Sequence, residues 1–227
     1  VKRIENAFKT AAAEKRAAFM PYITAGDPDL ETSRRLVIAM AQAGADIIEF
    51  GVPFSDPIAD GPTIQHANER SLAAGATVSK VFDCVRAIRR ESQVPLVLMG
   101  SYNPMYVRGI DECCREAADA GADGFIIPDL PPDHAEELIV PARKYGLGTI
   151  FLIAPTSTDA RLKLVAAKSA PFVYAVSLTG VTGARSALPP ELADFVARAK
   201  RFIKQPIAVG FGISTPDMAR EVAGMAE

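Results

Sequence analysis

Short apolar segments alternate with amphipathic helical segments along nearly the whole chain, and this alternation limits the fold more than any other feature. Each apolar segment is short and mostly apolar on both faces, which is typical of buried parallel strands. The segments predicted as strands are residues 19–26, 47–52, 94–102, 124–129, 149–154, 172–178 and 207–211. Strict alternation of strand and helix predicts either a (β/α)8 barrel or an open, doubly wound parallel sheet.

Two features favour the barrel. The first strand is not followed by the glycine-rich fingerprint of a dinucleotide-binding open sheet. A weak repeat is also present, because Ala-Gly-Ala-Asp ends a helix and opens a strand at 43–46 and again at 120–123. With 227 residues, the chain falls in the length range of one α/β barrel. We therefore expect a single barrel domain over residues 1–227, with an extra N-terminal helix at 4–16.

The last residues, Ala-Gly-Met-Ala-Glu at 223–227, look like a third copy of this repeat, at the point where an eighth strand should begin. We therefore expect a shortened form of a longer barrel, truncated at the C-terminus and without its eighth β/α unit. A barrel closes only when strand number, tilt and stagger agree. The first and seventh strands, with edges at 20–24 and 207–211, are then expected to flank a gap.

A carboxylate stands in the middle of the second predicted strand. Side chains alternate along a strand, so Ile48 and Phe50 share an apolar face while Glu49 lies on the opposite face. A strand that serves only structure rarely carries an acidic residue there. Asp60 follows eleven residues later in a proline-rich loop. Two carboxylates so placed suit paired acid–base chemistry, with a salt bridge and a turn residue as the plain alternative.

Two glycine clusters follow the last two predicted strands. The first is Thr-Gly-Val-Thr-Gly at 179–183, and the second is Gly-Phe-Gly at 210–212. Bare backbone N–H groups in such loops can bind a phosphate, and the phosphate site of a barrel usually lies at its last β/α loops. The pattern favours a phosphate site, with ordinary turn glycines as the alternative.

Composition excludes several functional classes. A net charge of −2 gives no electrostatic basis for binding nucleic acid or an anionic membrane, and no apolar run reaches membrane-spanning length. Cys84, Cys113 and Cys114 have neither a disulfide framework nor the spacing of a zinc site. We therefore expect reduced thiols, a cytoplasmic protein and no metal site.

Several motifs resemble one known family. The segment Glu-Phe-Gly-Val-Pro-Phe-Ser-Asp-Pro-Ile-Ala-Asp-Gly-Pro-Thr-Ile-Gln at 49–65 is similar to the signature of the tryptophan synthase α subunit family. The resemblance extends to Pro-Tyr-Ile-Thr-Ala-Gly-Asp-Pro at 21–28, Met-Gly-Ser-Tyr-Asn-Pro at 99–104, Pro-Asp-Leu-Pro at 128–131, Gly-Val-Thr-Gly-Ala at 180–184 and Gly-Phe-Gly-Ile-Ser at 210–214. It covers essentially the whole chain.

This resemblance implies a (β/α)8 barrel lyase of tryptophan biosynthesis, which cleaves indole-3-glycerol phosphate by retro-aldol chemistry to indole and glyceraldehyde 3-phosphate. It implies no cofactor in this subunit, and a partner β subunit that holds pyridoxal phosphate in an αββα heterotetramer. Two alternatives stay open from the residues alone. One is another phosphate-binding barrel lyase or isomerase, which has no special use for both Glu49 and Asp60. The other is a non-catalytic barrel that only binds and activates a partner.

Site residues follow from the resemblance by position. Glu49 and Asp60 match the catalytic pair of the family, and Tyr174 matches the tyrosine that supports it. The implied substrate-binding residues are Tyr22, Tyr102 and Ile153 around the indole ring, and Thr182, Gly183, Gly210, Phe211 and Gly212 in the two glycine clusters. Glu49 would protonate indole C3 and then take the proton of the neighbouring hydroxyl. Asp60 would accept the indole N–H and stabilise the developing positive charge.

The loops around the site carry two further expectations. Residues 55–61 and 178–188 are expected to be mobile without ligand and to order over substrate, with Thr182 contacting Asp60. Prolines and apolar groups just beyond the strand ends are expected to form a rim on which the partner docks. The rim residues are Pro53, Phe54, Pro57, Asn103, Pro104, Pro131 and Pro132.

Overall fold

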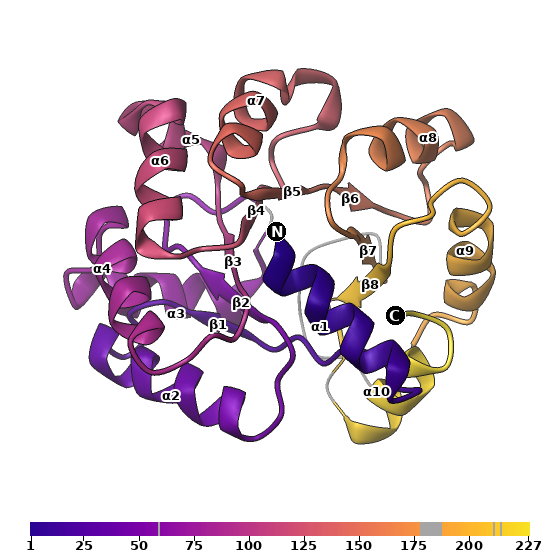
Figure 1. The fold of residues 1–227 in the computed structure, drawn as a ribbon, viewed down its shortest axis with the longest axis horizontal. Coiled ribbons are helices and arrows are strands. Elements are labelled where there is room, and N and C mark those ends of the chain that lie inside the picture. The colour runs from indigo at the N-terminus through magenta and orange to yellow at the C-terminus, as the bar shows by residue number, and fades with distance from the viewer. Residues whose placement is uncertain (59, 178–187, 211, 214) are drawn as a thin grey trace.

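The computed structural model of the chain shows a ring of parallel strands surrounded by helices (Figure 1). It describes residues 1–58, 60–177, 188–210, 212–213 and 215–227. The strands are β1 (Tyr22–Thr24), β2 (Ile48–Gly51), β3 (Leu96–Met99), β4 (Gly124–Ile126), β5 (Gly148–Ile150), β6 (Leu152–Ile153), β7 (Val173–Val176) and β8 (Ile207–Gly210). Because paired strands run parallel, their carboxyl ends and the loops that follow them meet at one end of the barrel.

Helices connect the strands along the outside of the ring. They are α1 (Lys2–Ala13), α2 (Leu30–Gln42), α3 (Pro62–Ala73), α4 (Val78–Arg89), α5 (Tyr102–Arg108), α6 (Ile110–Ala120), the 3₁₀ helix η1 (Pro132–His134), α7 (Glu136–Lys144), α8 (Asp159–Lys168), α9 (Leu192–Ala199) and α10 (Pro216–Ala223). Asp29, Thr77, Thr158 and Thr215 each accept a hydrogen bond from the backbone N–H three residues further on. Such caps satisfy N–H groups that have no partner within the helix.

The strands form two parallel sheets that meet at Phe151. Strands β1 to β5 pair in sequence order, and so do β6 to β8. The prediction of a single strand at 149–154 is therefore wrong: the ladder with β4 ends at Ile150, and Leu152 and Ile153 pair with β7 instead. Phe151 connects β5 to β6, and its carbonyl accepts the N–H of Tyr174 on β7 at 3.1 Å.

Strands β1 and β8 are not paired with each other in the part of the chain that the structure describes, as expected for strands that flank a gap. The backbone of Glu227 lies between their two edges. Its carbonyl accepts the N–H of Ala18 at 2.7 Å, and its N–H donates to the carbonyl of Ile207 at 3.1 Å. The Glu227 carboxylate also accepts the Ile207 N–H at 2.9 Å. Glu227 therefore joins β8 to the segment that precedes β1.

The inner core fills the barrel and is closed at its amino-terminal end by α1. Ile47 and Val97 from the strands pack in one cluster with Ile4 and Phe8 of α1. The ring centroid of Phe8 lies 5.4 Å from that of Phe172 on the approach to β7. Helix α1 thus covers this end of the barrel, while Glu49 lies further along β2, toward the connecting loops.

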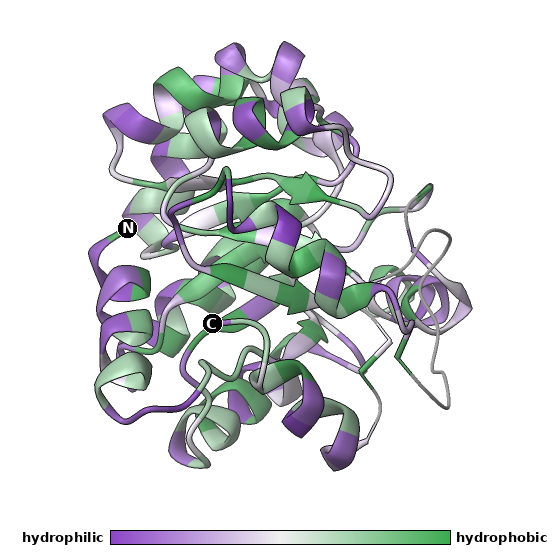
Figure 2. Cartoon of the chain, turned by 90° about the vertical axis from the view of Figure 1, so that its right-hand side faces the viewer, coloured by the Kyte–Doolittle hydropathy of each residue, from purple (hydrophilic) through white to green (hydrophobic). Residues whose placement is uncertain are grey.

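A second, larger core lies between the strands and the outer helices. The outward-facing strand residues Phe50, Leu98 and Phe125 pack there against Val85 of α4 and other helix residues. Figure 2 shows the resulting pattern: the strands are largely hydrophobic, while the helices carry many hydrophilic residues. An inward-facing side chain therefore reaches a site, whereas an outward-facing one only supports the packing of the helices.

Two helices differ from the sequence prediction. The strand predicted at 94–102 ends at Met99 as β3, and Tyr102 instead begins α5. The Asp129 carboxylate accepts the N–H of Tyr102, the first residue of this helix, at 2.9 Å, from 27 positions further along the chain. No local pattern reveals such a partner. The amphipathic pattern of residues 191–204 predicts one helix there, but α9 covers only Leu192–Ala199.

Candidate active site

Glu49 lies inside the barrel on β2. Its register neighbours are Tyr22 on β1 and Val97 on β3, and the residue is only 3% exposed. Burial raises the pKa of the Glu49 carboxyl from 4.5 to about 8, and a hydrogen bond from Tyr174 partly opposes this rise. Glu49 is therefore protonated at neutral pH, as a general acid must be before it acts.

Tyr174 supports Glu49 from the opposite wall. It lies on β7, is 3% exposed, and donates its hydroxyl hydrogen bond to the Glu49 carboxylate. Burial, and then the charge of Glu49, raise the pKa of Tyr174 well above 10, so the phenol stays a donor at every working pH. The supporting role in catalysis that the resemblance implies for Tyr174 stays a prediction.

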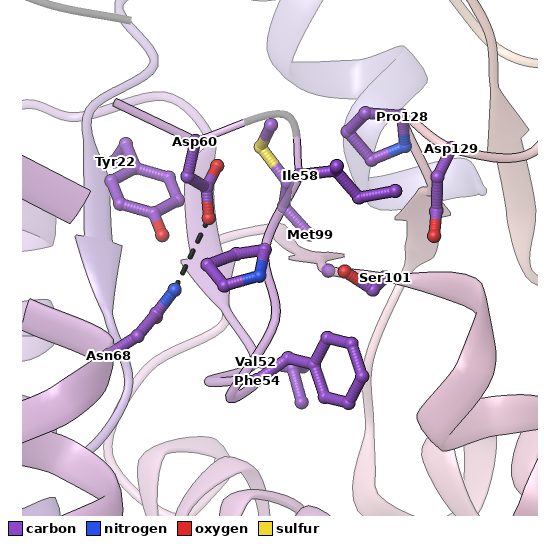
Figure 3. Close-up of a pocket in the computed structure, with 12 residues that line it drawn as sticks. Tyr22, Val52, Phe54, Ile58, Asp60, Asn68, Met99, Ser101, Pro128 and Asp129 are labelled. Carbon is purple, nitrogen blue, oxygen red and sulfur yellow. Dashed lines mark hydrogen bonds between the residues drawn. The ribbon is translucent and has the colours of Figure 1, made fainter. Parts of the chain in front are cut away.

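Asp60 lies in the loop between β2 and α3, next to the helix that follows it. Its Oδ2 accepts a hydrogen bond from Nδ2 of Asn68 at 3.2 Å (Figure 3). Nε2 of Gln65 donates to the backbone carbonyl of Asp60 at 2.8 Å. Burial raises the pKa of the Asp60 carboxyl above its ordinary value, and the Asn68 hydrogen bond opposes that rise.

Tyr22 stands between the two carboxylates. Burial raises the pKa of Tyr22 strongly, and the charges of Asp60 and Glu49 both add to the rise, so both carboxylates are near its hydroxyl. That hydroxyl lies 3.2 Å from the hydroxyl of Thr24. It also lies over Gly51, where an added Cβ would be only 2.2 Å from the Tyr22 oxygen. Gly51 thus leaves the space into which the tyrosine extends.

A cavity of about 730 Å³ opens beside these groups. Glu49, Tyr174, Tyr22 and two residues of the second glycine cluster, Gly210 and Gly212, line it. Its volume is in the range of natural small-molecule sites, and it continues between the facing edges of β1 and β8. A smaller polar cleft adjoins it, lined by Tyr22, Asp60 and Asn68 among others (Figure 3). Tyr22 borders both spaces, so one ligand can meet both acids.

Two residues assigned to the indole pocket are not placed there by the structure. Tyr102 begins α5, and its hydroxyl donates to Glu137 of α7 at 3.2 Å, while its neighbour Ser101 lines the smaller of the two cavities. Ile153 points outward into the core beneath the helices. The alternation of side chains puts its neighbour Leu152 on the inner face instead, where it packs with the inner cluster. Neither residue lines the two cavities among the described residues, and their implied contact with the indole ring stays a prediction.

Thr182, Gly183 and Phe211 lie outside the described residues, as does most of the loop expected at 178–188. Their implied roles, including the contact between Thr182 and Asp60, therefore stay predictions. The mobility expected for 55–61 also stays a prediction.

Sequence reasoning missed Asn68 and Met99. Asn68 lies in mid-helix and contacts Asp60, and Met99 ends β3 on the inner face and lines the polar cleft. An amide buried in the middle of a helix is itself a signal, because asparagine is a poor helix former and a costly group to bury. Leu152 could have been found by a strict count of strand alternation.

The predicted docking rim is only partly exposed. Pro53 and Pro132 are buried, whereas the other rim residues are at least partly accessible. Three further apolar side chains are prominent at the surface of the loops that follow β2 and β3: Ile58 is 79% exposed, Tyr106 60% and Val107 78%. Exposed apolar groups gathered at one end of a molecule are typical of a protein-binding surface.

Metal-site and membrane features were also sought in the described ranges. No group of three or more histidine, cysteine or acidic side chains gathers there as a metal site would. No helix there has the length and hydropathy of a bilayer-spanning helix. Cys84, Cys113 and Cys114 are free and buried, and burial raises the pKa of Cys113 and Cys114 to about 12.

Comparison with known proteins gives a consistent result. The family model described as tryptophan synthase alpha chain matches residues 8–227. The tryptophan synthase alpha chain of Geobacter sulfurreducens is 49% identical over 225 residues, which cover 99% of this chain and 85% of the relative.

Solved structures agree in fold as well as in sequence. Tryptophan synthase subunit alpha from Legionella pneumophila superposes with a TM-score of 0.91 at 39% identity, covering 99% of this chain and 83% of that one. A chain of the tryptophan synthase α2β2 complex from Pyrococcus furiosus gives a TM-score of 0.87 at 42% identity, covering 92% and 84%. With its buried inward-facing Glu49, its nearby Asp60 and a family match over almost its entire length, this chain belongs to the tryptophan synthase alpha chain family of (β/α)8-barrel lyases.

Proposed function

We propose that Glu49, Asp60 and Tyr174 carry out the lyase reaction of this family here, the cleavage of indole-3-glycerol phosphate into indole and glyceraldehyde 3-phosphate. The observation that carries the proposal is the state of Glu49: it is buried inside the barrel, bonded to Tyr174, and its pKa is raised to about 8. A carboxyl that is protonated at neutral pH and faces a cavity can donate a proton and later accept one.

The reaction follows from this state in two steps. Glu49 first gives its proton to C3 of the indole ring, which makes the ring an electron-accepting cation. The resulting carboxylate then removes the proton of the hydroxyl beside the scissile bond. The oxygen lone pair forms the aldehyde carbonyl, the carbon–carbon bond breaks, and its electron pair returns to the indole ring. Glu49 ends protonated, so one residue acts as acid and then as base.

Asp60 is proposed to stabilise the positive charge that develops on the indole ring. Its carboxylate accepts the indole N–H and stabilises the cation formed when C3 is protonated. The half-buried position of Asp60 strengthens this interaction, because an electrostatic attraction is screened less where water is excluded. The N–H groups of Gly210 and Gly212, together with the first glycine cluster, are proposed to hold the substrate phosphate.

The assembly is the second part of the proposal. The relative from Pyrococcus furiosus is part of an α2β2 complex, and this chain presents exposed apolar groups at Ile58, Tyr106 and Val107. We assign this surface to a β subunit that holds pyridoxal phosphate, in an αββα heterotetramer. The chain itself is proposed to need no cofactor, since its acid pair supplies the chemistry. Its three free cysteines fit a reducing cytoplasm.

Indole release from indole-3-glycerol phosphate tests the function directly. It should be measured for the chain alone and with a β subunit, with indole followed by its absorbance. Indole formed in both cases supports the lyase, with a higher rate in the complex. Binding to the β subunit without any cleavage would instead identify a non-catalytic activator, and cleavage of other phosphorylated substrates alone would indicate a different barrel lyase.

A further inference from the structure

Asn68 is a buried amide in the middle of a helix. It is 4% exposed on α3, where asparagine is less favourable than most residues. A buried amide costs free energy unless its polar atoms are bonded. Its Nδ2 donates to Oδ2 of Asp60 at 3.2 Å, so the amide finds its partner in a carboxylate of the site rather than in the packing of the helix.

Helix α3 is fixed to the loop that follows β1, just beyond Asn68. Oγ of Ser71 donates to the carbonyl of Ala25 at 2.6 Å. Arg70 forms two hydrogen bonds of 2.8 Å to the carboxylate of Asp27. Gly26 has a φ of +90° and leaves room for the serine, because a Cβ there would lie 2.5 Å from Ser71 Oγ. These contacts hold one turn of α3 rigidly against the barrel, directly after Asn68.

The start of the same helix holds Asp60 from the other side. Gly61 is the N-cap and Pro62 the first helical residue, so Asp60 directly precedes the positive end of the helix dipole. Nε2 of Gln65 bonds to the backbone carbonyl of Asp60 at 2.8 Å. Asp60 is thus held twice by α3, at its backbone through Gln65 and at its carboxylate through Asn68.

No arginine or lysine lines the polar cleft among the residues that the structure describes. The titratable groups that face Asp60 there are Tyr22 from β1 and Asp129 after β4, and Glu49 of β2 faces the adjoining cavity. These groups are neutral or negative, so none of them favours the charged form of Asp60. Burial disfavours that form as well, and the Asn68 amide opposes both effects because a donor to a carboxylate lowers its pKa.

We propose that Asn68 is a positioning residue for the reaction: it orients the Asp60 carboxylate toward the substrate and keeps it in its charged form. The inference deepens the proposed function and rests on it, since Asp60 must be charged to stabilise the indole cation. The rigid attachment of α3 to the β1 loop makes the amide a fixed donor rather than a mobile one. Such fixed donors need no reorganisation when the reaction occurs.

Two variants separate this role from simple packing. Asn68→Leu keeps the size of the side chain and removes the donor, and Asn68→Asp keeps the shape and adds a like charge. Glu69→Gln is the matched control, because Glu69 is the next residue on α3, is exposed and pairs only with His66 among the described residues. Each variant is measured with the β subunit present, as the pH dependence of kcat/KM for indole release and as thermal stability.

The expected result is a displaced acid limb of the profile. In Asn68→Leu it moves to higher pH by about one unit, as expected for the loss of one hydrogen bond to a charged group, and further in Asn68→Asp. The limb on the basic side, set by Glu49, stays in place. The Glu69→Gln variant matches the wild type throughout. An unchanged acid limb in both Asn68 variants, with only a lower melting temperature, would show that Asn68 merely supports packing.

A second measurement does not depend on activity. The carboxyl ¹³C resonance of Asp60, identified by its absence in Asp60→Asn, is titrated in wild type and in Asn68→Leu. A higher midpoint in the variant supports the inference even if indole release fails and the proposed function is wrong. Equal midpoints in the two proteins would overturn the inference even if the lyase activity is confirmed.

Discussion

The hydroxyl of Tyr174 occupies the space that a side chain on Gly210 would need. A Cβ built on Gly210 would lie 1.8 Å from the Tyr174 oxygen, far inside any allowed contact. In the register of β7 and β8, Tyr174 is paired with Ala208 and Gly210 with Val176, so the phenol reaches Gly210 two positions further along β8. The same hydroxyl bonds to Glu49. The glycine therefore decides where the acid of the site is held, although it makes no hydrogen bond to that acid itself.

Gly210→Ala should accordingly impair cleavage through Tyr174. The methyl group must displace the phenol from Glu49, and a displacement of about 1 Å near reacting groups costs on the order of 10²-fold in rate. Steady-state indole release measures the loss. Adding Tyr174→Phe should not restore activity, because a Cβ on Gly210 would also lie 2.2 Å from Cζ of the ring, and the hydroxyl bonded to Glu49 would be lost.

Gly224→Ala is the control for this change, since Gly224 is exposed and has ordinary helical geometry after α10. Near-normal activity of Gly210→Ala would contradict the steric argument.

Glu49→Gln keeps the shape of the side chain and removes its titrating proton. Cleavage should fall by at least about 10²-fold, the low end for general acid–base catalysis. Asp60→Asn should also be severely impaired, because a neutral amide stabilises the ring cation less than a carboxylate does. Single-turnover formation of indole is the suitable measurement. A Glu49→Gln protein that cleaves at nearly the normal rate would show that another group supplies the proton.

Stability should depend on pH through Glu49. A carboxyl whose pKa is about 8 in the folded protein and about 4.5 in the unfolded chain binds more protons when folded. The free energy of unfolding must then fall as pH rises from about 4.5 to about 8, by at most about 5 kcal/mol. Urea unfolding of wild type and Glu49→Gln at pH 5.5 and pH 9 measures this. The wild type should lose stability relative to the variant at the higher pH, and a constant difference would mean that Glu49 titrates normally.

Association with the β subunit should depend on the exposed apolar side chains near the site. Val107→Glu places a charge on a side chain that is 78% exposed on α5, and should weaken the complex at least about tenfold if it lies in the buried centre of the interface. Val140→Glu on α7 is the matched control, because Val140 is 63% exposed on an outer helix. Sedimentation of the mixed subunits gives the dissociation constants. Equal weakening by both changes would count against a specific surface.

Local sequence patterns predicted much of the fold, because strand and helix formation depend mainly on residues that are close together in the chain. The alternation of apolar strands and amphipathic helices specified the barrel class, and a carboxylate in mid-strand singled out Glu49. Tyr102 shows where this reasoning ends. The backbone N–H of Tyr102 is bonded to Asp129, far along the chain, so the start of α5 depends on a contact that no local pattern encodes.

The sequence by itself determined the order of strands and helices, the family, and the acids Glu49 and Asp60, since each depends on residues close together in the chain. Only the tertiary structure decided how those acids are held. Tyr174 on β7 bonds to Glu49 in the space that Gly210 on β8 leaves free, and Asn68 on α3 bonds to Asp60. Burial among these elements raises the pKa of Glu49 to about 8. The loss of hydration that causes this rise depends on every wall of the barrel at once, so no local segment encodes it.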